Sequence, residues 1–316
     1  MITSARVFLV AAASLALVSC DDVEGFGFAG SSQRFKEDFH NTYPLKAGGR
    51  VTLETMNGSV EITGWEKDSV DIIGTKYAAT ESLLQSIKVD IAATADSVDI
   101  RTLFPSGTRG NFGAKYIIRV PHKAVLDRIT SSNGSLRVES VDGPARLKTS
   151  NGAVRISRVN GLVDLHTSNG GVDVNDQTGG LIVRTSNGAV RVDNVRGSFE
   201  AVTSNGGIHV RLSDPEPQKA IKLESSNGTV ELTMERIKDN DIRINTSNSS
   251  IQLRLPANAG GQLRAHTSNS SITTDFDVNV KAGQISKSRL EGAIGSGGGP
   301  MFDLSTSNGN IKVQKL

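Results

Sequence analysis

The tetrapeptide Thr-Ser-Asn-Gly, or a close variant of it, recurs along most of this chain at nearly fixed spacing. Its asparagines are separated by 18 residues four times in succession, and then by 22, 21, 21 and 39 residues. Such a step indicates units that stack on one another, because so short a unit cannot bury its own apolar side chains. The repeated asparagines are Asn133, Asn151, Asn169, Asn187, Asn205, Asn227, Asn248, Asn269 and Asn308, and an outlying copy of the motif contains Asn57.

Apolar residues alternate with polar ones on both sides of each motif. In the repeat that starts at Asn151, Val154 and Ile156 follow the motif, and Val163 and Leu165 precede the next one. Short alternating runs of this kind predict β-strands. We therefore predict an all-β fold, a single-stranded parallel β-helix (β-solenoid) with about 18–22 residues per coil, right-handed by the general preference of parallel crossovers. The alternative, a β-sandwich with independent Asn-Gly hairpin turns, does not require a fixed step.

The motif itself suggests a corner of the coil. We count positions within a repeat from its asparagine, which is position 0. The strand pattern places the asparagines on the inner side, where stacked amides about 4.8 Å apart can form a hydrogen-bonded ladder. Glycine at position 1 is expected to supply a positive φ at this corner. Ser249 and Ser270 replace that glycine in two copies, which predicts corners of another type or strained ones.

The N-terminal residues have the layout of a signal peptide. Arg6 precedes an apolar run, Val7 to Val18, that is too short to span a membrane comfortably. The run ends in Leu-Val-Ser before Cys20, the only cysteine, so no internal disulfide can form. This ending resembles a bacterial lipobox, which implies lipid attachment to Cys20 and removal of residues 1–19. The alternative is an ordinary signal peptide with an incidental cysteine.

The presence or absence of the regular repeat divides the remaining chain into segments. Residues 20–44 are expected to be the lipidated cysteine and a tether, and residues 45–316 a β-solenoid domain. Within that domain, 45–130 are predicted to be an irregular N-terminal segment that caps the stack, and 131–316 regular repeats with an insertion near 275–300. Trp65, the only tryptophan, falls at a position that predicts burial in the core.

Three stretches together resemble the bacterial putative-adhesin family, a β-strand-repeat domain of unknown function. They are the repeated "TSNG-x-V-x-V", the early "NGSVEITGWEKDSVDI" and the late "RLEGAIGSGGGPMFDLSTSNGNIKV". The resemblance covers roughly residues 45–316. It implies a β-helix-like fold and a location in the cell envelope, and it brings no assigned activity.

Candidate catalytic residues are few. β-Helical enzymes that cleave polysaccharides need paired acids, or an acid and a base, on adjacent coils. Asp176 and Asp193, one coil apart at a corner, come closest to such a pair. Exposure of that corner to solvent explains two acidic residues there equally well. Arg137, Arg155 and Arg191 could form a basic stripe for phosphate or sulfate groups, but Asp173 interrupts it.

Metal sites are not indicated either. The stretch "NGGVDVNDQTGG" lacks the calcium-binding β-roll pattern. His166 and His266 lie too many repeats apart to share a metal ion. The five histidines are His40, His122, His166, His209 and His266. We therefore predict no catalytic residue, no metal and no cofactor.

The sequence thus predicts a non-enzymatic, lipid-anchored envelope protein that acts as an adhesin or interaction scaffold. Its partners would be the membrane, through lipidated Cys20, and a protein or envelope polymer. A formal net charge of +2 gives no reason to expect nucleic acid. The expected location is the periplasmic face of the inner membrane or the outer membrane. Two alternatives stay open, a β-helical polysaccharide-active enzyme and a structural partner of a membrane stress regulator.

Overall fold

The structure is a computed structural model that describes residues 35–105, 107, 110–295 and 297–316. All of these belong to residues 32–316, one of the two compact units into which contacts divide the chain. The predicted signal peptide, Cys20 and the first residues of the predicted tether lie outside the described residues. None of the helices among the described residues is long and apolar enough to cross a membrane.

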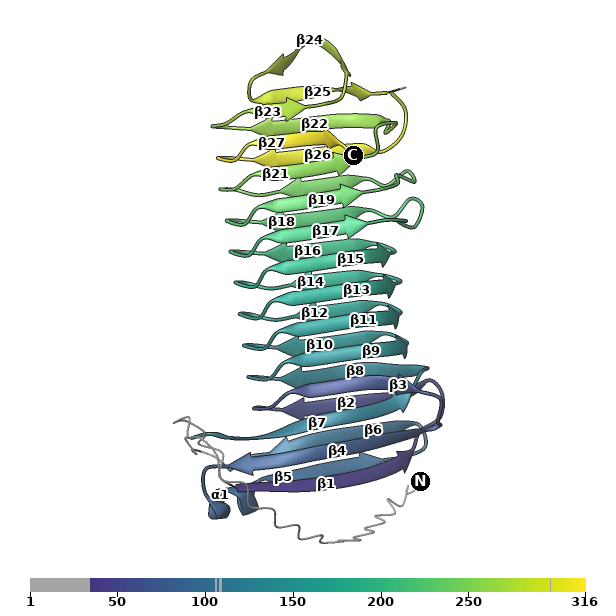
Figure 1. Cartoon of the computed structure of the whole chain (residues 1–316), viewed down its shortest axis with the longest axis vertical. Helices are drawn as coiled ribbons and strands as arrows, with labels where there is room; N and C mark the ends of the chain where they lie inside the picture. The colour runs from purple at the N-terminus through teal and green to yellow at the C-terminus, as the bar shows by residue number, and fades with distance from the viewer. Residues whose placement is uncertain (1–34, 106, 108–109, 296) are drawn as a thin grey trace, which may run out of the picture. The chain divides into compact units, whose positions relative to one another are not determined.

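Two long sheets enclose one apolar core (Figure 1). Sheet A has 13 strands in the spatial order β1 (Phe35–Pro44), β4 (Ser69–Ala78), β7 (Phe112–Pro121), β3 (Val60–Trp65), β9 (Leu136–Asp142), β11 (Val154–Asn160), β13 (Val172–Thr178), β15 (Val190–Arg196), β17 (Ile208–Leu212), β19 (Val230–Met234), β21 (Ile251–Leu255), β27 (Ile311–Lys315) and β23 (Ile272–Thr274).

Sheet B faces sheet A and completes each coil. It has 14 strands in the spatial order β24 (Val278–Ser286), β25 (Arg289–Ile294), β22 (Gly261–Thr267), β26 (Met301–Thr306), β20 (Ile242–Asn245), β18 (Ile221–Ser225), β16 (Phe199–Thr203), β14 (Leu181–Arg184), β12 (Val163–His166), β10 (Ala145–Thr149), β8 (Ala124–Ser131), β2 (Gly49–Thr55), β6 (Ser97–Leu103) and β5 (Lys88–Ala93). The short helix α1 (Glu81–Ser86) lies between β4 and β5 in sequence.

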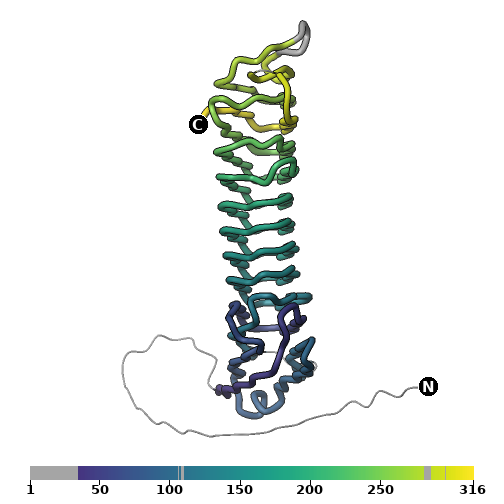
Figure 2. The backbone as a smooth tube through the Cα atoms, turned by 90° about the vertical axis from the view of Figure 1, so that its right-hand side faces the viewer, coloured from purple at the N-terminus to yellow at the C-terminus, as the bar shows by residue number. Residues whose placement is uncertain are grey.

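Each regular coil contributes one strand to each sheet, and equal repeat positions pair in parallel. Val154 pairs with Val172 in sheet A, and Val163 pairs with Leu181 in sheet B. These side chains are fully buried. Figure 2 shows the regular windings stacked above one another. The predicted all-β solenoid is therefore confirmed, whereas the right-handed sense of its coils stays a prediction.

A left-handed residue at position 7 bends the sheet A strand in each of four successive regular coils. Ser140, Arg158, Asp176 and Asn194 have φ between 52° and 59°. This residue interrupts the alternation, so positions 5 and 8 both point inward although they differ in parity. Val159, for example, is 1% exposed. The sequence pattern did not reveal this bend.

The prediction for the glycine at position 1 is wrong. Gly134, Gly152, Gly170 and the equivalent glycines of the later repeats do not have positive φ, whereas Gly58 in the outlying copy does, with φ of 136°. A Cβ atom at Gly152 would instead lie 1.9 Å from the carbonyl oxygen of Gly134 one coil below, and one at Gly170 would lie 1.7 Å from that of Gly152. Close approach of neighbouring coils is what requires glycine here. Ser249 fits another local arrangement, in which its hydroxyl donates to Asn227 O at 2.9 Å.

The last coil of the chain is not the last coil of the stack. β26 lies between β20 and β22, and β27 lies between β21 and β23. The chain forms coil β22–β23 one step further out, adds the antiparallel hairpin β24–β25, and returns to fill the gap. Figure 1 shows this yellow end of the chain between green strands. The expected insertion near 275–300 is thus the hairpin, and the stacking order departs from the sequence order.

The N-terminal end of the stack has a similar exchange. The coil β2–β3 lies between β8–β9 and β6–β7, and antiparallel strands β1, β4 and β5 close this end. The predicted tether, 20–44, is wrong for residues 35–44, because β1 pairs with β4 along its whole length. Trp65 is half-buried rather than in the core, with Lys67 Nζ 4.9 Å from its ring centroid.

Candidate interaction surface

The nine repeated asparagines lie in one row at the corner between sheet B and sheet A. Asn151 Nδ2 donates to Asn133 Oδ1 at 2.6 Å, and Asn169 Nδ2 donates to Asn151 Oδ1 at 2.7 Å. The same bond links all other members, with Asn308 between Asn248 and Asn269. All nine side chains are exposed, so the expectation that they point inward is wrong. The chain turns one residue earlier than the alternation indicates.

A threonine or serine two residues before each asparagine, at position 16 of the 18-residue repeats, forms the buried polar row instead. Thr149 Oγ1 donates to Gly134 O at 2.9 Å, and Thr167 Oγ1 donates to Gly152 O at 3.2 Å. The equivalent bonds start from Thr185, Thr203, Ser225, Thr246, Thr267 and Thr306. Each hydroxyl therefore ties its corner to the neighbouring coil and satisfies a buried carbonyl. Recurrence of threonine was visible in the sequence, but its partner was not.

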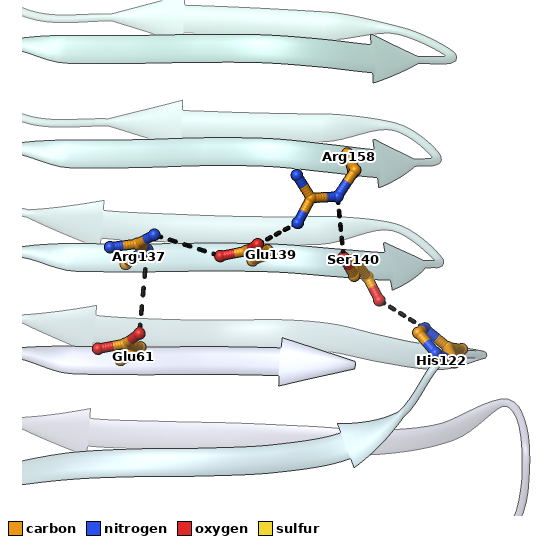
Figure 3. Close-up of polar contacts among 6 residues, drawn as sticks. All are labelled: Glu61, His122, Arg137, Glu139, Ser140 and Arg158. Atoms are coloured by element: carbon orange, nitrogen blue, oxygen red, sulfur yellow. Dashed lines mark hydrogen bonds and ion pairs between the residues drawn. The ribbon is translucent and has the colours of Figure 1, made fainter. Parts of the chain in front are cut away.

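A polar network crosses the outer face of sheet A at the start of the regular coils (Figure 3). Arg158 bonds Glu139 and donates to Ser140 Oγ at 3.2 Å, and Arg137 Nη2 donates to Glu139 Oε2 at 3.3 Å. His122 Nδ1 lies 2.8 Å from the backbone oxygen of Ser140 and not against its hydroxyl. Since a general base must reach the proton it removes, this arrangement does not activate Ser140 as a nucleophile.

A shallow hollow follows on the outer face of sheet A, across β11, β13, β15, β17 and β19. Two polar contacts border it: the ion pair of Arg155 with Asp173 at 3.8 Å, and His209 Nδ1 at 3.3 Å from Glu231 Oε2, which is an ion pair when the imidazole is protonated. A third contact, the ion pair of Arg211 with Glu235, lies where β19 ends. The full lining is Arg155, Asp173, Asn175, Arg191, Val192, Asp193, His209, Val210, Arg211, Glu231 and Thr233.

The outer face of sheet B also carries rows of opposite charges. Arg184 lies 3.5 Å from Asp164 and 3.6 Å from Glu200, on the strands to either side. Lys222 continues the row with Glu200 at 3.8 Å. Exposed pairs of this kind contribute about 0–1 kcal/mol each to stability. Both faces thus carry charges of both signs.

The predicted candidate residues are not brought together into a reactive cluster. Asp176 accepts a hydrogen bond from Asn194 Nδ2 at 2.8 Å, at the bend, whereas Asp193 lies on the flat face in the hollow. His166 and His266 are exposed on β12 and β22, far apart along sheet B. Within the described residues, no group of three or more His, Cys, Asp or Glu could hold a metal ion.

Asp71 and Tyr116, at the N-terminal end of the stack, are among the ionisable groups with shifted pKa values. Burial acts to raise the pKa of Asp71, but hydrogen bonds from His40 at 2.6 Å and Thr42 at 2.9 Å hold it below its usual value. Burial raises the pKa of Tyr116 to about 12, against a hydrogen bond with Thr102. Asp71 thereby links β4 to β1, and Tyr116 links β7 of sheet A to β6 of sheet B.

Two parallel sheets closed around one core by short, register-matched coils define a β-solenoid repeat protein with exposed flat faces. The chain belongs to the Toastrack DUF4097 family, whose match covers residues 49–314. No curated protein is similar to it in sequence.

Several solved structures resemble the chain weakly. One, described as a putative cell adhesion protein from Clostridium sporogenes, has 9% identity and a TM-score of 0.23, covering 89% of this chain and 100% of its own. A putative adhesin from Bacteroides fragilis has 13% identity and a TM-score of 0.28, with 89% and 97% covered. A putative adhesin from Parabacteroides merdae has 10% identity and a TM-score of 0.26, with 89% and 96% covered. Similarity at this level says nothing about what this chain binds.

Proposed function

We propose that this protein is a lipid-anchored, non-enzymatic scaffold of the cell envelope whose flat sheet faces bind a protein or an envelope polymer. One observation carries the proposal: equal positions pair from coil to coil, so side chains of one kind of position form continuous exposed rows on both faces. Rows of this extent offer many weak polar contacts over a broad area, as other solenoids do.

Anchoring through Cys20 is the element of the proposal that rests on sequence. The lipobox-like Leu17-Val18-Ser19 before Cys20 supports acylation, and each buried CH₂ of an acyl chain adds about 0.8 kcal/mol of membrane affinity. We expect the wild-type protein in the membrane fraction and a lipid-modified N-terminal Cys20 by mass spectrometry. Cys20→Ala should release the protein from the membrane. Unmodified Cys20 in a membrane-bound protein would contradict the anchor.

Binding by the faces can be tested with a photo-crosslinking residue in the anchored protein. We place it at Thr233 on sheet A, at Lys148 on sheet B, and at the exposed loop residue Glu216 as the matched control. The same envelope component should crosslink reproducibly at a face position and not at Glu216. Equal crosslinking at all three positions contradicts the proposal. So does a hydrolase or lyase activity on a glycan panel that Asp176→Asn abolishes.

A further inference from the structure

The hollow on sheet A contains one cation and one anion that have no ion-pair partner. Arg191 and Asp193 lie two residues apart on β15, on the same face, and both are exposed. Within the described residues, neither has a charged partner within 4.0 Å, although pairs form on the strands to both sides. Asp193 faces Arg211 on β17. The hydrogen bond from Arg211 to Glu235 and, to a smaller extent, the charge of Asp193 raise the pKa of Arg211, but Asp193 forms no ion pair with it. Cross-strand pairing therefore leaves Arg191 and Asp193 available for a ligand.

Neighbours of Arg191 explain why it stays unpaired. Asp173 is its direct neighbour on β13, but Asp173 lies 3.8 Å from Arg155 on the other side. His209 is its neighbour on β17, and His209 pairs with Glu231 at 3.3 Å. The residues on both sides of Arg191 thus have other partners, and Arg191 itself is exposed. A planar carboxylate fits the fork of its guanidinium with two parallel hydrogen bonds, and a phosphate group does so as well.

The chemistry of the hollow favours a sugar polymer over a protein. Stable protein interfaces centre on buried aromatic, aliphatic or arginine anchors in pockets. Here the apolar lining is limited to Val192 and Val210, which are each 4% exposed. The remaining lining groups are guanidinium, amide, carboxylate, imidazole and hydroxyl groups. Sugar hydroxyls can donate to carboxylates such as Asp193 and accept from amides such as Asn175.

We propose that this hollow binds a carboxylate-bearing glycan, with Arg191 holding a sugar carboxylate and Asp193 and Asn175 holding its hydroxyl groups. The site deepens the proposed function by naming the class of envelope polymer, and it rests on that function. Arg191 and Asp193 lie about 6.6 Å apart along the strand, at about 3.3 Å per residue, so adjacent groups of one sugar can reach both.

The test titrates the full-length protein in detergent with acidic oligosaccharides and two matched probes. Oligogalacturonate and oligomannuronate carry carboxylates and hydroxyls. The methyl ester of oligogalacturonate keeps the hydroxyls and removes the charge, and polyglutamate keeps the carboxylates and removes the hydroxyls. We expect binding of at least one acidic oligosaccharide, and weaker binding of both matched probes.

Variants then locate the site. Arg191→Gln should weaken binding about tenfold or more, as expected for loss of charge-assisted hydrogen bonds. Asp193→Asn should weaken it less, because an amide still accepts one hydrogen bond. Arg146→Gln is the control, since Arg146 is also exposed, pairs with Asp127 on sheet B, and undergoes the same change of charge. Urea unfolding of each variant verifies that the fold is kept.

Three results would overturn the proposal: no binding of either acidic oligosaccharide, equal binding of the ester or polyglutamate, or an equal loss in Arg146→Gln. Its failure is distinguishable from failure of the proposed function. If no glycan binds but the crosslinks from the faces persist, the proposed scaffold stands and the glycan site does not. If the face positions Thr233 and Lys148 also give no specific crosslink, both the proposed scaffold function and the glycan site are wrong.

Discussion

Thr167 closes a corner of the solenoid from the inside, and replacing it by valine tests the buried polar row. The residue is 0% exposed, and its hydroxyl donates to Gly152 O at 3.2 Å and accepts from Gly170 N at 3.3 Å. Valine has nearly the same shape but neither donates nor accepts. Thr167→Val therefore removes two hydrogen bonds with little change in packing, and it leaves two buried backbone groups without a partner.

The expected magnitude follows from those two groups. A buried donor or acceptor that loses its partner costs about 1–3 kcal/mol. Partial adjustment of the corner offsets some of this, so we expect Thr167→Val to lower the free energy of unfolding by about 2–4 kcal/mol. Asn169→Ala also removes two side-chain bonds, to Asn151 at 2.7 Å and from Asn187 at 2.6 Å. Water replaces these exposed bonds, so that loss should be about 1 kcal/mol or less.

Urea unfolding followed by circular dichroism measures both variants against the wild type. An unchanged slope with denaturant allows the shift in midpoint to be converted into a free-energy difference. Asn169→Ala is the matched control, since it removes the same number of bonds from the outside of the same corner. A loss for Asn169→Ala that equals or exceeds the loss for Thr167→Val would refute the reasoning, because the exposed row would then hold the coils together.

Three further perturbations test other regions of the fold. Gly170→Ala would place a Cβ 1.7 Å from a carbonyl oxygen of the coil below and should destabilise by about 2 kcal/mol or more, whereas Gly171→Ala, with its nearest atom at 3.6 Å, should be nearly neutral in the same urea assay. The hydrogen bonds from β1 that lower the pKa of Asp71 contribute stability that is present at neutral pH and is lost as the pH falls through that lowered value. Asp71→Asn should therefore cost stability at pH 7 and progressively less below about pH 4, as thermal unfolding across pH would show. Phe302 is fully buried in the inserted coil, so Phe302→Ala should cost about 3–5 kcal/mol. Hydrogen exchange should then accelerate in residues 261–294, which attach to the stack through that coil, and unchanged exchange there would contradict the attachment.

Local details of the motif were only partly predictable. Alternation in the sequence located the buried valines, leucines and isoleucines correctly, because strand geometry fixes which side chains share a side. It placed the asparagines on the wrong side, since the turn begins at the serine before them. The bend at Asp176 and its equivalents was not recognised either. Serine, arginine, aspartate and asparagine occupy it, so no single residue type marks it in the sequence.

For the candidate binding residues too, the sequence identified the residue types but not their partners. The unpaired state of Arg191 could not be read from the sequence, where Asp173 stands one repeat away and looks like its natural partner. Only the side-chain positions show that Asp173 lies nearer to Arg155. The separation of Asp176 from Asp193, at a bend and on a flat face, is likewise a result of the local backbone.

The sequence by itself determined the step, the strand pattern and the stacked coil, because a fixed repeat with matched apolar positions can bury its core only by stacking in register. The stacking order at both ends was decided by the tertiary structure alone. All coils present nearly the same edge, with valine, leucine or isoleucine at equivalent positions, so local sequence does not distinguish neighbours in the chain from neighbours in space. Coil β26–β27 lies between coils β20–β21 and β22–β23, and the hairpin β24–β25 extends sheet B beyond β22, an arrangement that only the assembled end of the stack shows.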